Sequence, residues 1–178
     1  AEYKAKGWEN VICYGMVSTL DDVKNAAAAE MNIVCSAAAI KAAEYLKEKF
    51  GTPYEIEYPR SCLPEEIVQK AYNFTDKNVL VIHNQTAADA VRKLITEKSG
   101  KCHCTSATFF MQKKELSQQS DFFLADESDL CDNVGDNYDV VIADKTLRRV
   151  MKNFSGEFID FPHFGLSGRL LQGESEKI

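Results

Sequence analysis

The chain has 178 residues, of which 45% are apolar and 27% are charged, and its formal net charge is −6. This composition is typical of a globular protein with one domain or two small lobes, and it excludes a disordered or fibrous chain. The negative charge and the absence of a Lys/Arg cluster argue against nucleic acid and anionic membranes as partners. No apolar run approaches the length of about 20 residues that a membrane-spanning helix needs.

The N-terminal half is predicted to alternate strands and helices. The expected elements are a strand over 11–17, a helix over 20–30, a strand over 32–35, a helix over about 36–50 and a strand over 54–58. Ser18 or Thr19 could cap the first helix. In the second helix Ile40, Ala43, Leu46 and Phe50 recur at helical spacing, and Gly51 is the expected C-terminal cap.

After the turn-rich stretch PRSCLP the alternation continues to the end of the chain. The expected elements are a helix from Pro64 to about Tyr72, strands over 78–83, 101–110, 122–126, 139–144 and 157–162, and helices over 86–98, 129–134 and 145–152. Residues 112–120 are expected to form a short polar helix or a turn. Short apolar strands alternating with helices indicate an α/β fold with parallel sheets flanked by helices. The break at PRSCLP divides the chain into two Rossmann-like lobes, 1–62 and 63–178.

Six cysteines are present, at positions 13, 35, 62, 102, 104 and 131. An even number is compatible with three disulfides, but several of these cysteines lie in strand-like apolar runs. The N-terminal sequence AEYKAKGWEN also has no signal-peptide core. Reduced thiols in a cytoplasmic protein are therefore favoured. The abrupt start and the end in RLLQGESEKI lead us to expect a fragment of a longer protein.

Candidate ligands follow the strands, because open parallel sheets bind ligands outside the carboxyl ends of their strands. The residues expected there are 15–19, 35–37, 83–86, 126–128, 144–146 and 162–167. Among them only Cys35, His83 and His163 are strong metal ligands. Asp126 and Asp144 also end strands, but capping the following helix is the favoured role for both.

Each candidate ligand has a simpler alternative. A helix N-terminus favours a thiolate at Cys35, yet a buried cysteine also behaves as a small apolar residue. His163 could pair with Asp160 or with a backbone carbonyl, and His83 could be held in the same way. Cys102 and Cys104 share one face of the expected strand over 101–110, but no second ligand pair with zinc-site spacing accompanies them. Glycine-rich phosphate loops and the GxSxG motif are absent.

The order of several segments resembles the component 1 family of nitrogenase-type oxidoreductases, the molybdenum–iron protein and its relatives. NIVC followed by YLKEKFGTPY is similar to the family's strand and helix that ends in E-K-x-G-x-P, and the preceding GMVSTLDDVKNAAAAEMN is similar to its short helix. NVLVIHNQTAADAVRKLITEKSG, FFLADESDL, YDVVIADKTLRRVM and FIDFPHFGLSGR are similar to later family segments in the same order. The resemblance spans about residues 8–170.

The resemblance implies a C-terminal portion of a component 1-like oxidoreductase that binds a metallocluster or a reducible substrate between lobes. In the catalytic family subunit one cysteine and one histidine hold the iron–molybdenum cofactor. Cys35 matches the cysteine by its spacing to Gly51, whereas His163 stands one residue closer to Ser167 than the family histidine does, and Pro162 occupies the matching position. Implied cofactors are an iron–sulfur or iron–molybdenum-type cluster in the full-length protein, with none expected in the fragment itself.

The implied partners are a paired component 1-like subunit, or a second copy in a homodimer, and an ATP-dependent iron–sulfur reductase that delivers electrons. The chain is shorter than a family subunit, and the uncharged SAAA after Cys35 does not favour an anionic cofactor. A divergent relative, such as a cofactor scaffold, a chlorophyllide reductase or a nickel-tetrapyrrole reductase, is therefore favoured over an enzyme that reduces dinitrogen. The alternatives are a non-catalytic metallocofactor or small-molecule binding module and a lobe for oligomerisation.

Overall fold

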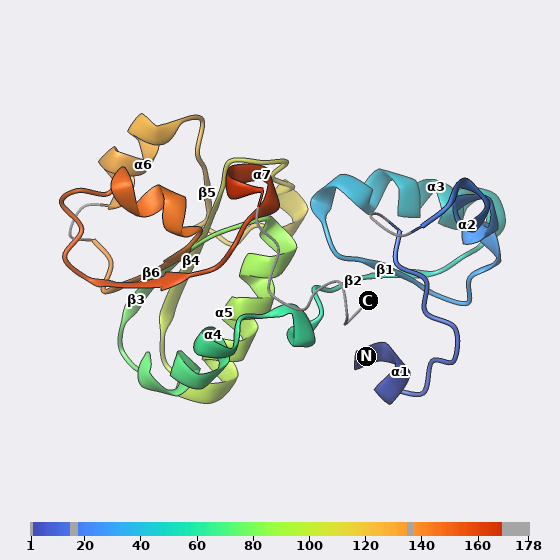
Figure 1. Ribbon diagram of the computed structural model, residues 1–178, viewed down its shortest axis with the longest axis horizontal. Coiled ribbons are helices and arrows are strands. Elements are labelled where there is room, and N and C mark those ends of the chain that lie inside the picture. The colour runs from blue at the N-terminus through green and yellow to red at the C-terminus, as the bar shows by residue number, and fades with distance from the viewer. Residues whose placement is uncertain (1, 15–17, 135–136, 169–178) are drawn as a thin grey trace.

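Two parallel sheets form the framework of the computed structural model, which describes residues 2–14, 18–134 and 137–168 (Figure 1). The smaller sheet pairs β1 (Asn32–Val34) with β2 (Tyr54–Ile56). The larger sheet has the order β5-β4-β3-β6-β7, formed by β3 (Asn78–Ile82), β4 (His103–Thr108), β5 (Phe122–Phe123), β6 (Val140–Ala143) and β7 (Glu157–Asp160). The α/β class with helix-flanked parallel sheets is confirmed.

Helices connect the strands in the order that the sequence predicts. The α-helices are α1 (Glu2–Ala5), α2 (Leu20–Lys24), α3 (Ile40–Phe50), α4 (Glu65–Lys70), α5 (Gln85–Ser99), α6 (Glu127–Val134) and α7 (Phe164–Ser167). The 3₁₀ helices are η1 (Asn25–Ala28), η2 (Ala37–Ala39), η3 (Arg60–Cys62), η4 (Ala71–Asn73), η5 (Lys114–Leu116) and η6 (Lys145–Arg149). None of the helices in the described residues is both long and apolar enough to cross a membrane.

The smaller sheet carries its own apolar core. Val34 of β1 packs with Ala37, Ile40 and Ala43, which lie on η2 and on the inward face of α3. Gly51 ends α3 with a positive φ of 76°, and its N–H donates to the Lys47 carbonyl at 2.9 Å, as expected for a left-handed C-terminal cap.

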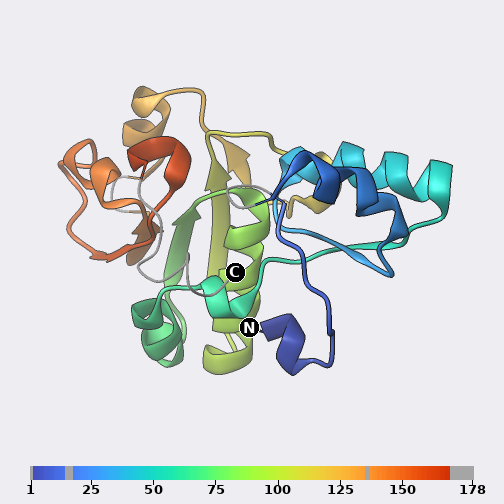
Figure 2. The same ribbon diagram turned by 45° about the vertical axis from the view of Figure 1, so that its right-hand side comes forward.

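The larger sheet is covered on both faces because its central strands are apolar on both sides. In β3, Val79 and Val81 face α4 and α5, whereas Leu80 and Ile82 face α6 and η6. Figures 1 and 2 show α5 on the side of this sheet that is nearer to the smaller sheet. The N-terminus of α5 is thereby available to contact both sheets.

The chain changes direction in the larger sheet between β3 and β6. From β3 the connections run outward through β4 to β5, and the chain then returns to β6 on the other side of β3 and continues to β7. Such a topological switch point opens a crevice at the carboxyl ends of the two diverging strands. His83 follows β3 and Asp144 follows β6, so both residues flank the switch point.

Two local predictions are wrong. Residues 11–14 of the strand expected over 11–17 form no strand, and Val11, Ile12 and Tyr14 are each more than 40% exposed; residues 15–17 lie outside the described residues. Phe50, expected on the inward face of α3, is 59% exposed and contacts the Tyr45 ring edge-on at 6.4 Å instead. In both places the apolar pattern is present, but no neighbouring element in the described part of the chain covers it.

Candidate functional site

Cys35 lies directly after β1, as the sequence predicts. The following helical segment begins as η2, and its N-terminal cap is Ser36, whose hydroxyl accepts a hydrogen bond from the Ala38 N–H at 3.3 Å. Ser36 rather than Cys35 therefore occupies the capping position. The Cys35 thiol contacts the Ile33 carbonyl only at 4.0 Å, which leaves the sulfur without a strong hydrogen bond.

The surroundings of Cys35 favour a neutral thiol. Burial, followed by the charges of Cys13, Cys62 and Glu57, raises the pKa of Cys35 to about 11. This result is opposite to the thiolate that the strand–helix junction suggested, because among the described residues no positive charge offsets the loss of solvent. A cationic metal centre at the sulfur would supply that missing positive charge.

The N-terminus of α5 contacts Cys35 from the larger sheet. Asn84 caps α5 by accepting a hydrogen bond from the Ala87 N–H at 2.9 Å. Two residues further along, the buried Thr86 hydroxyl donates to the backbone carbonyl of Cys35. The carboxyl end of β1 is thus attached to the first turn of α5.

His83 is buried one residue before this cap. Its side chain is 6% exposed, its ring stacks on Phe161 with centroids 3.9 Å apart, and its Nε2 atom lies 3.0 Å from the Pro162 carbonyl oxygen. Burial and the neighbouring His163 lower the pKa of His83 to about 3. His83 is therefore a neutral imidazole at physiological pH.

His163 lies above His83 in the loop that leads from β7 into α7. The two imidazole centroids are 4.5 Å apart, and the His163 ring stacks on Phe110 at 5.1 Å. Its Nδ1 atom accepts a hydrogen bond from the Gly165 N–H at 3.1 Å, which caps α7. Burial lowers the pKa of His163, although the Asp144 carboxylate opposes this shift.

Asp144 holds this loop from the other side of the switch point. Its fully buried carboxylate accepts hydrogen bonds from the Thr146 N–H at 2.9 Å, from the His163 N–H at 2.9 Å and from the Ser167 hydroxyl. Burial alone would raise the pKa of Asp144, but these donors lower it well below its usual range. Asp144 caps η6, as predicted, and also positions the His163 backbone.

Asp126 and Asp160 have simpler roles. The Asp126 carboxylate accepts hydrogen bonds from the Ser128 and Asp129 N–H groups at 2.8 and 3.1 Å, so it caps α6 as predicted. The Asp160 carboxylate accepts a hydrogen bond from the Lys145 N–H at 2.8 Å, and the Nδ1 atom of His163 accepts one from the Gly165 N–H. Helix α7, from which the Ser167 hydroxyl donates to the Asp144 carboxylate, was not predicted from the sequence. The two closely spaced glycines of FGLSG are the sequence feature that could have indicated this short helix.

The structure brings His83 and His163 together but not Cys35 and His163. Within the described residues no contact joins the Cys35 thiol to the His163 imidazole, and no three His, Cys, Asp or Glu side chains are grouped closely enough to hold a metal ion. Thiol and imidazole donors fit an iron centre in kind. The buried His83 Nδ1 atom also has no hydrogen-bond partner among the described residues, so this nitrogen is free to act as a ligand.

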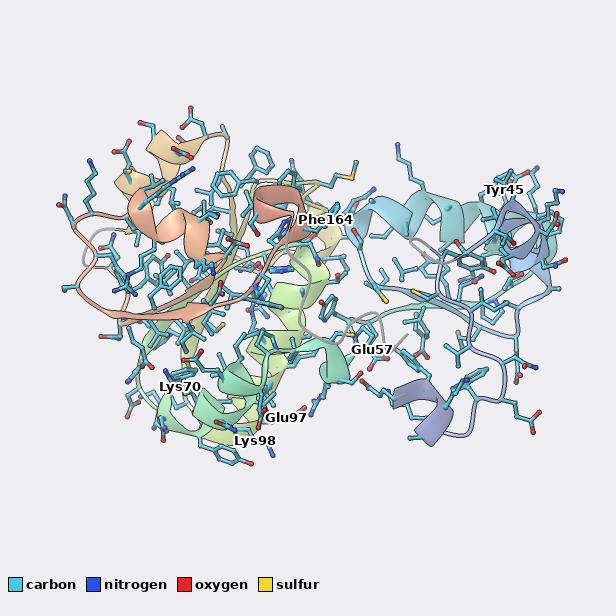
Figure 3. The ribbon with its side chains drawn as sticks, in the orientation of Figure 1. Tyr45, Glu57, Lys70, Glu97, Lys98 and Phe164 are labelled. Carbon is cyan, nitrogen blue, oxygen red and sulfur yellow. The ribbon has the colours of Figure 1, made fainter. Side chains whose placement is uncertain are left out.

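A cavity of about 160 Å³ lies between the end of β2 and α5, and its lining includes Thr86, whose hydroxyl binds the Cys35 carbonyl. Polar and charged residues supply much of its lining, namely Glu57, Tyr58, Arg60, Thr86, Asp89 and Lys93. Figure 3 shows Glu57 between α5 and the smaller sheet, whereas Phe164 projects from α7, where it is 65% exposed. This arrangement leaves space for a small polar ligand near the Thr86–Cys35 contact.

Comparison with known proteins supports the fold. No protein-family model matches the sequence, and no curated protein matches it. Among solved structures, the chain is similar to nitrogenase Cp1 at pH 6.5, with a TM-score of 0.52 and 15% sequence identity over 84% of this chain. The shared property is the fold. The chain spans 42% of the length of that nitrogenase chain.

Proposed function

We propose that this chain is part of a nitrogenase component 1-like oxidoreductase that binds a metallocluster or a reducible substrate between lobes 1–62 and 63–178. The observation that supports the proposal is that segment 83–86 contacts both predicted ligands, Cys35 and His163. Thr86 binds the Cys35 backbone, and His83 contacts the His163 ring, so a single helix start adjoins both predicted ligands. This helix start flanks the switch point, where ligands of parallel sheets bind.

In this proposal Cys35 binds iron as a thiolate and His163 binds or hydrogen-bonds the same group. The bound group, an iron–sulfur or iron–molybdenum-type cluster in the full-length protein, would store electrons. The chain's own residues hold and orient it. Asp144 fixes the His163 backbone, and Thr86 fixes the Cys35 backbone.

The proposed partners follow from the same family resemblance. They are a paired component 1-like subunit or a second copy of this chain, and an ATP-dependent iron–sulfur reductase that donates electrons in the cytoplasm. The fold similarity to nitrogenase Cp1 supports this assignment, and electron acceptance is the property that an experiment has to establish.

A second candidate function is a non-catalytic module that binds a small molecule or a metallocofactor on the same fold. The cavity between the end of β2 and α5 favours it, because that cavity is lined by both acidic and basic side chains and the thiol of Cys35 is neutral. This module would bind its ligand without any exchange of electrons.

The test uses the full-length protein that the gene encodes, purified without oxygen. Its iron content, its acid-labile sulfide content and its absorption spectrum are measured. Cys35→Ser and His163→Gln are expected to lose iron, whereas Cys131→Ser, which changes an exposed thiol on α6, is expected to retain it. Bleaching of the spectrum by an ATP-dependent iron–sulfur reductase would support the oxidoreductase. Bound iron that stays unbleached would support the binding module, and a colourless wild type would contradict the metallocluster.

A further inference from the structure

The cavity at the end of β2 is lined by elements of both sheets. Residues 56–58 belong to β2 and the chain that follows it, whereas residues 86, 89, 90 and 93 lie on α5. The cavity is therefore at the carboxyl end of a parallel strand, where such sheets bind ligands. Its volume of about 160 Å³ corresponds to about five water molecules in the liquid, which suits a compact ligand.

The charges of the lining favour a ligand that carries both signs. The ionisable side chains comprise two acids and two bases, namely Glu57, Asp89, Arg60 and Lys93. The two carboxylates repel an anion, and the two basic groups repel a cation, because like charges brought together in a binding site are costly. A small zwitterion avoids both repulsions.

Asp89 and Lys93 are the charges that the fold leaves available. The Asp89 carboxylate accepts no hydrogen bond among the described residues, and its ion pair with Arg92 is long, at 3.5 Å. Burial, which Arg92 and Lys93 only partly offset, raises the pKa of Asp89. Lys93 is exposed and has neither a hydrogen bond nor an ion pair within the described ranges. The two residues stand four apart on α5, a spacing at which acid and base can pair directly, yet they form no ion pair there.

The other two charges already have partners. Glu57 accepts a hydrogen bond from the Tyr3 hydroxyl at 3.1 Å and another from Lys6 at 3.4 Å. Arg60 pairs with Glu97 through Nη2. A guanidinium group has five N–H donors, so Arg60 keeps donors for a second acceptor.

We propose that this cavity binds a small free amino acid, with the ligand's ammonium group on the Asp89 carboxylate and the ligand's carboxylate on the Lys93 ammonium. The apolar part of the lining, Ile56, Ala90 and Leu116, would contact the short side chain. The inference rests on the second candidate function, the binding module, and names its ligand class. A bound amino acid would contact elements of both sheets.

The first test is isothermal titration calorimetry of the full-length wild type with glycine and alanine. Propionate and ethylamine are the matched controls, because each is alanine without one of its two charged groups. Alanine is expected to bind saturably, and both controls should bind at least about tenfold more weakly, since each loses one charge-assisted contact. Propionate that binds as tightly as alanine, or no saturable binding of either amino acid, would overturn the inference.

The second test replaces the two available charges. Asp89→Asn and Lys93→Gln should each weaken alanine binding at least about tenfold. Asp76→Asn and Lys101→Gln are the controls, because they change an exposed ion pair of 3.6 Å outside the cavity and should match the wild type. Lys93 is exposed and unpaired within the described ranges, so its replacement should leave the fold intact. Unchanged alanine affinity in both cavity variants would contradict the site.

The single-charge ligands show which end of the amino acid each residue holds. Asp89→Asn removes a repulsive charge and should raise the affinity for propionate, whereas Lys93→Gln should raise the affinity for ethylamine. A general loss of structure would instead weaken every ligand. The opposite pattern, with ethylamine favoured by Asp89→Asn, would refute the assigned orientation.

The outcomes separate this inference from the metallocluster. Cys35 does not line the cavity, so Cys35→Ser should lose iron and still bind alanine as the wild type does. A wild type that contains iron but does not bind glycine or alanine would refute the amino-acid site and leave the metallocluster standing. Alanine binding by a colourless wild type would refute the metallocluster and support the site. Absence of both iron and amino-acid binding would refute both.

Discussion

The Thr86 hydroxyl of α5 donates a hydrogen bond to the backbone carbonyl of Cys35, and this contact attaches the helix of one sheet to the strand end of the other. Both groups belong to short segments that are adjacent only in the folded chain, because they are separated by 51 residues. The bond thereby fixes where Cys35, a predicted ligand, lies relative to the carboxyl ends of the strands in the larger sheet.

Replacement of Thr86 by Val should weaken this attachment. Val keeps the shape of the side chain but leaves the Cys35 carbonyl without its donor, which we expect to cost about 1 to 3 kcal/mol of unfolding free energy. Thr86→Ser retains the hydroxyl and serves as the matched control. Urea denaturation of the two variants measures the difference, and equal stability would show that the hydrogen bond does not contribute.

The cysteines should differ widely in their reaction with iodoacetamide. Burial raises the pKa of Cys35 to about 11 and that of Cys104 to about 12, whereas Cys13 and Cys131 are exposed. At about pH 8 the smaller thiolate fraction alone should slow Cys35 at least about a hundredfold relative to an ordinary exposed thiol. Mass spectrometry of the alkylated protein gives the order, and early labelling of Cys35 would contradict the buried neutral thiol.

Asp144→Asn should destabilise the loop that carries His163. The charged acceptor of the Thr146, His163 and Ser167 donors becomes a neutral amide, which we expect to cost about 1.5 to 3 kcal/mol. Because folding lowers the pKa of Asp144, its stabilising effect is present above about pH 4 and is lost as the pH falls.

The stability gap between the wild type and Asp144→Asn should therefore narrow in acid. Asp126→Asn is the control, since Asp126 is an exposed cap that we expect to contribute only about 0.5 to 1 kcal/mol. Urea denaturation at neutral and acidic pH measures both. A gap that widens in acid would show that the Asp144 carboxylate does not stabilise the folded protein.

The ion pair of Arg92 and Asp121 should contribute far more than its exposed counterparts. Arg92 Nη2 lies 2.5 Å from Asp121 Oδ1, and the two side chains are only 7% and 2% exposed. Asp121→Asn leaves the buried Arg92 charge with its longer, 3.5 Å contact to Asp89, so we expect a loss of about 3 kcal/mol. Glu157→Gln, which breaks the half-exposed pair with Lys70, should cost less than about 1 kcal/mol. Similar losses of unfolding free energy in both variants would show that burial does not strengthen the Arg92–Asp121 pair.

Local patterns were sufficient for most of the elements and for the positions of the candidate residues. The alternation of apolar strands and helices predicted the parallel sheets, Thr19 caps α2, and Gly51 ends α3. The rule that ligands lie at carboxyl strand ends placed Cys35, His83 and His163 there. Each of these features depends on a few neighbouring residues, which is why the sequence was informative.

Which side chains are buried, and which residues contact each other, depended on contacts between distant segments. Residues 11–14 have the composition of a strand but pair with no strand in the described part of the chain, and the thiol of Cys35 is neutral because burial raises its pKa. The proton positions on His83 and His163 depend on the Pro162 carbonyl and the Gly165 N–H.

The sequence alone thus determined the α/β class, the helix caps and the strand-end location of the candidate ligands, because propensity and periodicity act over a few residues. Only the tertiary structure decided that His83 contacts His163, that Cys35 is attached to Thr86, and which imidazole keeps a free lone pair. Solvent exclusion and hydrogen-bond partners come from segments far apart in the chain, and no local pattern encodes them.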